Sequence, residues 1–166
     1  MAEQDEVKGS GSEAQNAGNQ PQFALQRLFL KDISFESPNS PEVFLGQWAP
    51  KVKMDVNTGA KSLDNDLYEV VLTITVTVEN ADKVAYLIEV KQAGIFGLKN
   101  IDEEVKKQAI GTICPTTLFP YAREAVDSMA TRGGFPPLHL APMNFDALYA
   151  DAANRQAEQE GGDTTH

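Results

Sequence analysis

The sequence predicts an α+β fold, in which an antiparallel sheet comes first and helices then cover one of its faces. Two observations predict this class. Four segments between residues 23 and 90 alternate apolar and polar residues with a period of two, whereas apolar residues after residue 100 recur at helical spacing. Such alternation is typical of an antiparallel sheet with one covered and one solvated face. We therefore expect a four-stranded antiparallel sheet with a long kinked helix and a shorter C-terminal helix packed on one face.

The four expected strands lie within residues 23–35, 52–56, 68–78 and 84–90. The turn at residues 80–83 is expected to join the third and fourth strands as a hairpin. Alternate side chains of a strand point to opposite faces, so one apolar set per strand should face the helices. The side chains expected on that face are Phe23, Leu25, Phe29, Ile33 and Phe35; Val52, Met54 and Val56; Tyr68, Val70, Leu72, Ile74, Val76 and Val78; and Val84, Tyr86, Ile88 and Val90.

The connection between the first two strands is about 14 residues long, which exceeds the usual hairpin loop of roughly two to five. We therefore expect it to cross over rather than to turn back tightly. Val43, Phe44 and Trp48 make this connection unusually apolar for a loop. Packing against the edge of the core is the simpler interpretation, but a loop is easily moved and its apolar side chains are candidates for binding.

Helical patterning begins after residue 100, where Pro115 and Pro120 predict a kink or a restart. Residues 121–132 predict a helix that Gly133 and Gly134 end. Residues 135–142 are too rich in proline for regular structure. A last helix is expected after its cap Asn144, with an apolar stripe formed by Phe145, Leu148, Tyr149 and Ala152.

The chain carries 24 acidic and 14 basic residues, a formal net charge of −10. Both ends are acidic and too poor in apolar residues to offset the entropy lost on ordering. We expect a disordered acidic leader over residues 1–21, a single domain over residues 22–155 and a disordered acidic tail over residues 156–166.

The charge and the apolar runs exclude several kinds of partner and location. Phosphate contacts need clustered basic residues, so we expect no nucleic-acid partner. No stretch approaches the roughly 18 apolar residues of a membrane span, and residues 1–22 lack the pattern of a signal peptide, so we expect no membrane insertion. Cys114 is the one cysteine, so no intrachain disulfide is possible and a cytoplasmic location follows as the default.

Motifs for catalysis, metals and cofactors are absent from the sequence. His139 and His166 are the two histidines, which is too few for an ordinary metal site. Asp64 and Asp66 resemble a fragment of a calcium loop without its glycine and closing Glu, so a solvated turn is the better interpretation. Cys114 with His139 is the one conceivable nucleophile pair, and a small buried side chain is the simpler account. We expect no enzyme activity and no cofactor.

Three stretches closely resemble the protein-export chaperone family SecB. The first is KDISFESPN at residues 31–39, followed by Pro41, Phe44 and Trp48. The second is LFPYARE at residues 118–124, and the third, which is the most specific, is GFPPLHLAPMNFDALY at residues 134–149. They occur in the family's order with similar spacing, and the resemblance covers about residues 22–150.

The resemblance implies a homotetramer built as a dimer of dimers. It also implies an ATP-independent chaperone that binds unfolded secretory precursors in the cytoplasm and transfers them to the translocation ATPase SecA. In the family, the crossover loop and the last helix flank the client groove. The expected client groove comprises Val43, Phe44, Trp48, Met54, Phe145, Leu148 and Tyr149, and the expected acidic SecA-docking face comprises Asp32, Glu36, Leu87 and Glu89.

Two other functions remain open from the sequence. A SecB-like chaperone dedicated to one client, such as an antitoxin, would share the same fold and groove. A protein that binds a small molecule, or a thiol enzyme, would instead need one enclosed pocket and a reactive Cys114.

Overall fold

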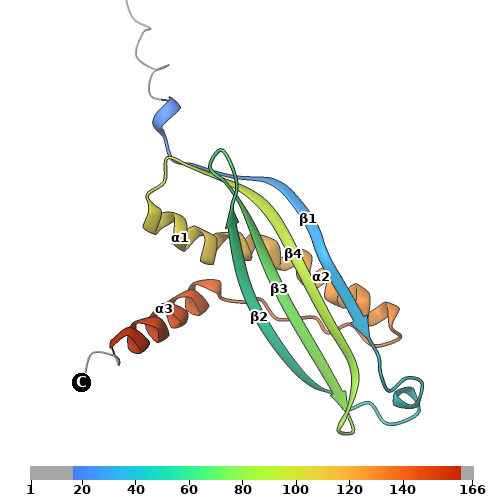
Figure 1. Cartoon of the computed structure of the whole chain (residues 1–166). Coiled ribbons are helices and arrows are strands. Elements are labelled where there is room, and N and C mark those ends of the chain that lie inside the picture. The colour runs from blue at the N-terminus through green and yellow to red at the C-terminus, as the bar shows by residue number, and fades with distance from the viewer. Residues whose placement is uncertain (1–16, 162–166) are drawn as a thin grey trace, which may run out of the picture.

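The structure, a computed structural model, describes residues 17–161 and contains the expected four-stranded antiparallel sheet (Figure 1). Its strands are β1 (Gln22–Glu36), β2 (Lys51–Ser62), β3 (Leu67–Asn80) and β4 (Lys83–Lys99). They are ordered β1-β4-β3-β2 across the sheet, so β1 and β2 are the two edge strands and the connection between them crosses over. Each strand is longer than the alternation alone predicted.

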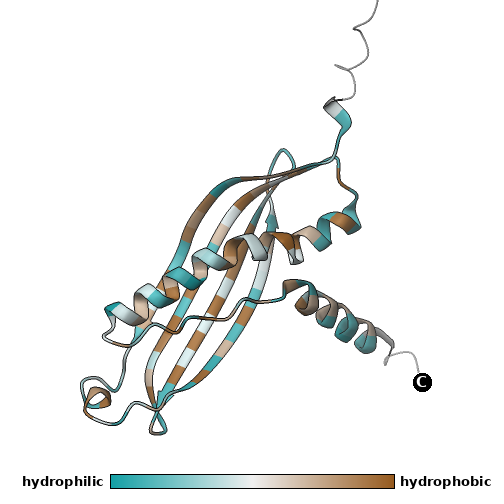
Figure 2. Cartoon of the chain, turned by 180° about the vertical axis from the view of Figure 1, so that it is seen from behind, coloured by the Kyte–Doolittle hydropathy of each residue, from teal (hydrophilic) through white to brown (hydrophobic). Residues whose placement is uncertain are grey.

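The helices are α1 (Glu103–Gly111), α2 (Ile113–Arg132) and α3 (Phe145–Gly161), besides short 3₁₀ turns at Ala17–Asn19 and Glu42–Phe44. α1 and α2 cover one face of the sheet, which we call the inner face (Figures 1 and 2). Within residues 17–161, no helix is both long and apolar enough to cross a membrane.

The core lies between the inner face of the two central strands and α2. Apolar side chains of β3 and β4 alternate with polar ones along each strand, as the banding in Figure 2 shows. The central inner positions are fully buried, and α2 covers them with its own apolar stripe. The largest contributors are Leu72, Ile74, Val76, Tyr86, Ile88, Val90, Phe96, Leu118 and Val126.

Two β-bulges in β1 correct the expected inner face of that strand. The pairing of β1 with β4 shifts between Leu25 and Arg27 and again between Leu30 and Asp32. Each bulge adds one residue, so the alternation changes phase and Phe29 pairs with Ala93 on the outer face. The prediction that Phe29 faces the helices is therefore wrong. Phe23, Leu25, Ile33 and Phe35 do face them, and Leu28 and Leu30 take the intervening positions.

A similar shift corrects the start of β4. The pairing moves between Val78 and Glu79, so Val84 lies opposite Glu79 on the outer face. Ala85 is fully buried in the core cluster where the sequence pattern had placed Val84.

The predicted helix restart lies at Thr112, between α1 and α2. Pro115 occupies the third position of α2, where the N–H that it lacks would have bonded to the carbonyl of Gly111 in a continuous helix. Thr112 leaves the helical conformation, and its hydroxyl donates to the Gln108 carbonyl at 2.7 Å. Pro120 lies inside α2 without ending it.

Capping residues fix the C-terminal end of α2 and the N-terminal end of α3. α2 ends as expected, because Gly134 has a positive φ of 87° and the Phe135 N–H donates to the Ala130 carbonyl at 2.9 Å. Asn144 caps α3, since its side-chain oxygen accepts the Ala147 N–H at 3.0 Å.

α3 corrects two expectations. Its first turns contact α1 and α2, but the rest of the helix extends away from the sheet instead of packing on it (Figure 1). It also continues to Gly161, past residue 155, where we had expected a disordered tail to begin. Residues 1–16 of the expected leader and 162–166 of the expected tail lie outside the described residues.

Candidate binding surfaces

An aromatic cluster holds the crossover loop on the inner side of the sheet. Phe135, which is 5% exposed, lies beneath the loop and contacts the rings of Phe44, Trp48 and Tyr86 at centroid distances of 4.9, 5.5 and 4.6 Å. Phe44 remains 47% exposed and Trp48 is partly buried. The cluster therefore presents two aromatic side chains of the loop to the surface on a fixed base.

The buried Asn80 sets the position of Trp48. Its side-chain nitrogen donates to the carbonyl of Gln47 at 3.0 Å, and its side-chain oxygen accepts the N–H of Ala49 at 2.8 Å. These two residues flank Trp48, so one amide side chain fixes the backbone on both sides of the indole. Both hydrogen bonds are part-buried, so loss of the amide would remove them and leave the two backbone groups without a protein partner.

The α3 end of the expected groove is a separate hollow of about 540 Å³, lined by β2, α1 and α3. Phe145 is buried and meets Phe119 edge-on, with the ring centroids 6.0 Å apart, so it anchors the helix. Leu148 is 41% exposed and Tyr149 is partly buried against Gly111. A Cβ on residue 111 would collide with the Tyr149 ring, so this close approach requires glycine.

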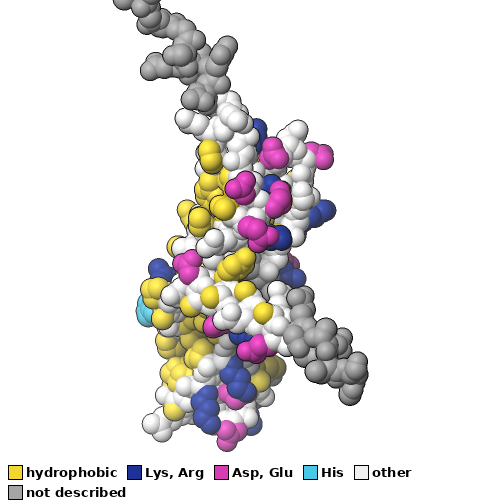
Figure 3. Space-filling model, turned by 90° about the vertical axis from the view of Figure 1, so that its left-hand side faces the viewer, with side chains coloured by type: hydrophobic (Ala, Val, Ile, Leu, Met, Phe, Trp, Pro, Cys, Tyr) yellow, Lys and Arg dark blue, Asp and Glu magenta, His cyan; other side chains and the backbone are white. Residues whose placement is uncertain are grey.

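The inner edge of β2 connects the two ends. Val56 lines the α3 hollow, and β2 begins at Lys51, next to the crossover loop. Val52 and Met54 lie between them on the inner face, paired with Val78 and Val76, and Met54 is 38% exposed. The α3 hollow contains three of the seven expected groove residues, and an accessible apolar strip runs from it along β2 to the crossover loop. Figure 3 shows apolar side chains reaching the surface among charged ones on the side from which it views the molecule.

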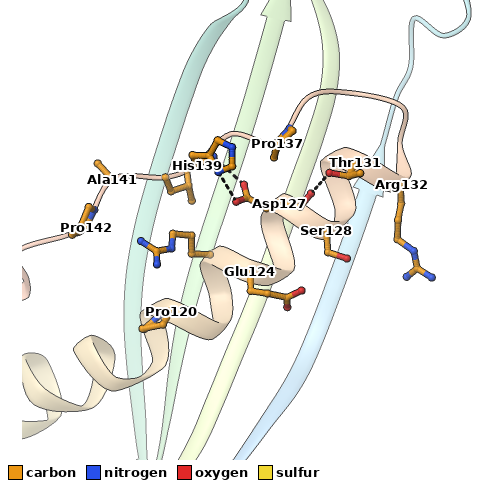
Figure 4. Close-up of a pocket in the computed structure, with 12 residues that line it drawn as sticks. Pro120, Glu124, Asp127, Ser128, Thr131, Arg132, Pro137, His139, Ala141 and Pro142 are labelled. Atoms are coloured by element: carbon orange, nitrogen blue, oxygen red, sulfur yellow. Dashed lines mark hydrogen bonds and ion pairs between the residues drawn. The ribbon is translucent and has the colours of Figure 1, made fainter.

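Asp127 fixes the connection between α2 and α3. Its Oδ1 accepts the N–H groups of Leu138 and His139 at 3.0 and 3.1 Å, and His139 Nδ1 lies 3.6 Å from Oδ2 (Figure 4). The connection thereby runs back along α2 and encloses a surface hollow of about 850 Å³ with it.

The charge of Asp127 also acts on the core. Burial first, and then the charge of Asp127, raise the pKa of Tyr86 to about 12.

The outer face of the sheet carries the four residues expected to dock a partner. Glu36 pairs with Leu87 across β1 and β4, and Ser34 pairs with Glu89. Asp32 lies two residues before Ser34 on the same face, because both bulges precede it. Asp32 and Glu36 are exposed, and Leu87 and Glu89 are partly exposed. The structure therefore brings all four together on one surface, opposite to the helices.

Cys114 is fully buried in the core, and burial raises the pKa of its thiol to about 12. His139 is exposed on the connection and faces Asp127, so it is not the partner of a Cys114 nucleophile. Among residues 17–161, no three His, Cys, Asp or Glu side chains are grouped to hold a metal ion.

Three residues of these surfaces were not singled out from the sequence. The sequence places Phe135 in a proline-rich segment and Asn80 in a turn, and it gives no signal for Gly111. Their roles depend on contacts with residues far away in the chain, such as Gln47 for Asn80 and Phe44 for Phe135. The one signal available was the apolar Phe135 directly after a glycine pair, a place where a chain often turns back onto the core.

A family model described as SecB, preprotein translocase subunit SecB, matches residues 16–156. The chain belongs to the SecB family. Protein-export protein SecB of Pseudomonas savastanoi pv. phaseolicola is 53% identical over 149 residues, covering 90% of this chain and 91% of that protein. Protein-export protein SecB of Ectopseudomonas mendocina is 50% identical over 166 residues, covering 100% of both.

A solved structure shares the fold of this SecB chain at low sequence identity. It is the SecB-like chaperone of Mycobacterium tuberculosis in complex with a ChAD peptide from an antitoxin. The two are 17% identical with a TM-score of 0.61, and the match covers 79% of this chain and 95% of that chain. The likeness confirms a SecB-like arrangement of the four-stranded sheet and its helices.

The chaperone prediction is confirmed by these comparisons. SecB is a family of protein-export chaperones, and relatives with about half of their residues identical bear that name. This finding favours the export chaperone over the dedicated-client and small-molecule interpretations. A chaperone family is also consistent with the expectation that the chain is not an enzyme.

We predict that Asn80→Ala loosens the crossover loop around Trp48. The substitution leaves the Gln47 carbonyl and the Ala49 N–H without their partner, so we expect the free energy of unfolding to fall by about 1–3 kcal/mol. Trp48 is the one tryptophan of the chain, so its fluorescence reports the loop directly and should shift toward that of a water-exposed indole. Asn57→Ala, at an exposed position of β2, is the control and should change neither quantity. An unchanged spectrum for Asn80→Ala would contradict the role of this amide.

We predict that Cys114 of the folded protein resists alkylation. Its thiol is buried and ionises at a pKa of about 12, so at pH 8 the reactive thiolate is scarce and shielded. Iodoacetamide should modify the native protein at least about a hundredfold more slowly than the urea-unfolded chain. Equal rates would contradict this burial and would reopen thiol chemistry at this residue.

Proposed function

We propose that this SecB chain binds unfolded precursor polypeptides in the cytoplasm, keeps them competent for translocation and delivers them to SecA without using ATP. The observation that carries the proposal is the accessible apolar strip. Phe44, Met54 and Leu148 are 47%, 38% and 41% exposed in a member of a protein-export chaperone family. A folded protein seldom leaves large apolar side chains aligned at its surface without a partner for them.

The energetics of such a surface favour many weak contacts. Fixing a backbone residue of an unfolded client costs roughly 1–2 kcal/mol, whereas burying one large apolar side chain returns about 1.5–3 kcal/mol. A short groove therefore retains only segments dense in aliphatic and aromatic residues. Trp48 and Phe44 give contact that tolerates many sequences, and Met54 adapts its shape to the client.

Strong capture then requires several grooves that hold one client at the same time. We propose a homotetramer built as a dimer of dimers, which supplies these copies. Apolar side chains outside the groove support assembly, because Ile113 and Tyr121 of α2 and Val105 of α1 are about half exposed. Edge strand β1 also leaves Phe23 and Leu30 accessible beside its free backbone edge.

We propose that the outer face docks SecA through Asp32, Glu36, Leu87 and Glu89. The carboxylates give charge complementarity to a basic surface, and Leu87 gives an apolar contact beside Glu36. Because this face lies opposite to the groove, a client and SecA can be bound at once. Attraction between exposed charges is screened by salt, so docking should weaken as ionic strength rises.

We predict that the protein suppresses aggregation of a refolding precursor without ATP and that Trp48→Ala weakens this activity. Loss of one buried indole contact per groove, about 1.5–3 kcal/mol, should lower client affinity about tenfold or more. Light scattering of the precursor measures suppression, and calorimetry measures client affinity. Gln47→Ala, which changes an exposed polar neighbour, is the control and should match the parent. Failure of the parent to suppress aggregation would reject the chaperone function, whereas equal client affinities for Trp48→Ala and the parent would reject the role of Trp48.

We predict that Asp32→Lys and Glu89→Lys each abolish binding to SecA while leaving client binding intact. Each change replaces attraction for a basic surface with repulsion within the docking face. Calorimetric titration with purified SecA measures the loss. Asp55→Lys is the matched control, because Asp55 lies on the outer face of the far edge strand and should affect SecA much less. Undiminished SecA binding by both docking variants would refute this surface.

A further inference from the structure

The carboxylates of the outer face differ in whether they already have a basic neighbour. Glu69 is paired with Lys31 at 2.6 Å, Glu79 with Lys53 at 3.7 Å and Glu89 with Lys91 at 3.7 Å. Within the part of the chain that the structure describes, Asp32 and Glu36 take part in no ion pair. The docking face therefore contains two carboxylates on β1 without an ion pair among the described residues, Asp32 and Glu36, and one on β4, Glu89, that is already paired with a lysine.

Lys91 stands at one end of the proposed docking residues. It lies opposite Asp32 across the β1–β4 pair and on the same face of β4 as Glu89, two residues away. Its ammonium approaches Glu89 Oε1, while Thr75 Oγ1 lies 3.5 Å from Glu89 Oε2. Both side chains of the ion pair are accessible, with 41% of Lys91 and 37% of Glu89 exposed. An exposed pair of this kind is weak enough for an incoming cation to displace.

The charge of the face follows from these positions. Asp32, Glu36 and Glu89 contribute −3 and Lys91 contributes +1, which leaves −2 for an approaching partner. Lys91 therefore lowers the net negative charge of these residues by one third and pairs with the one carboxylate of the set that lies on the central strand β4. A partner with two basic side chains can pair with Asp32 and Glu36 directly, whereas a third has to replace Lys91 at Glu89.

We infer that Lys91 is an internal competitor of the docking partner: it occupies Glu89 until a basic segment displaces it, and so limits the affinity of the acidic face. The partner is a polypeptide segment with at least three basic side chains, two of which engage the β1 carboxylates first. This inference rests on the proposed docking of SecA and deepens it. Lys91 is a positioning residue for Glu89, since it acts on the partner through that carboxylate.

Removal of the competing charge should strengthen docking. Calorimetric titration of the full chain with purified SecA at low salt should give an affinity about two- to fivefold higher for Lys91→Gln than for the parent, the range of an exposed ion pair. Lys91→Arg keeps the charge and should behave as the parent. Lys53→Gln is the matched control, because it removes the same charge from a pair of equal length, 3.7 Å, on the same face outside the docking residues.

A double-mutant cycle separates this role from a general effect of charge. In a Glu89→Gln background, Lys91→Gln should bring a much smaller gain, because the carboxylate that it would release is gone. The gain from Lys91→Gln should also shrink as salt is raised. Equal or weaker SecA binding by Lys91→Gln, or an equal gain from Lys53→Gln, would overturn the inference while Asp32→Lys still abolishes docking. Unchanged binding by Asp32→Lys would instead overturn the docking face itself.

Discussion

The structure depends on how much of the sheet one helix can cover. A helix with its side chains is about 10–12 Å wide, whereas strands lie about 4.8 Å apart, so α2 covers two strands of four. The burial pattern follows this limit. Inner positions of the central strands β3 and β4 are fully buried, while those of the edge strands β1 and β2 are largely accessible. The apolar strip that we propose for client binding is thus the part of a regular amphipathic sheet that a single helix leaves uncovered.

Two irregular segments turn this uncovered strip into a shaped surface. The crossover loop and the α2–α3 connection meet at Phe135, which supports Phe44 and Trp48 from below. Each segment lacks the regular hydrogen bonds of a strand or helix, and one polar side chain replaces some of them. Asn80 holds the loop and Asp127 holds the connection, each through two backbone contacts. Aromatic side chains that would be mobile on free loops are therefore held in place, which lowers the entropy that the proposed binding of a client would cost.

The period of two along each strand separates the two proposed activities. Inward residues of β1 and β4 build the core and the apolar strip, whereas the alternate residues build the charged outer face. A change in the charge of the outer face therefore has little effect on packing. The bulges in β1 matter here because the second restores the alternation that the first changes, so Asp32 and Glu36 lie on the outer face and Ile33 and Phe35 on the inner face. They also move Phe29 outward, so the outer face is partly apolar beyond Asp32.

The sequence by itself determined the fold class, the strands of the sheet and the helix ends at Gly133 and Asn144, because alternation, capping and turn chemistry are local. It also determined the family, through motifs of the crossover loop and of residues 118–149, and it predicted the residues that we propose for the two surfaces. Only the tertiary structure decided the phase of β1, since a bulge depends on the neighbouring strand and leaves no local pattern. It likewise decided the course of α3, the hydrogen bonds of Asn80 to the residues on either side of Trp48, and the pairing of Lys91 with Glu89. Contacts across strands and loops are set by packing between segments distant in the chain, and no spacing within one segment records them.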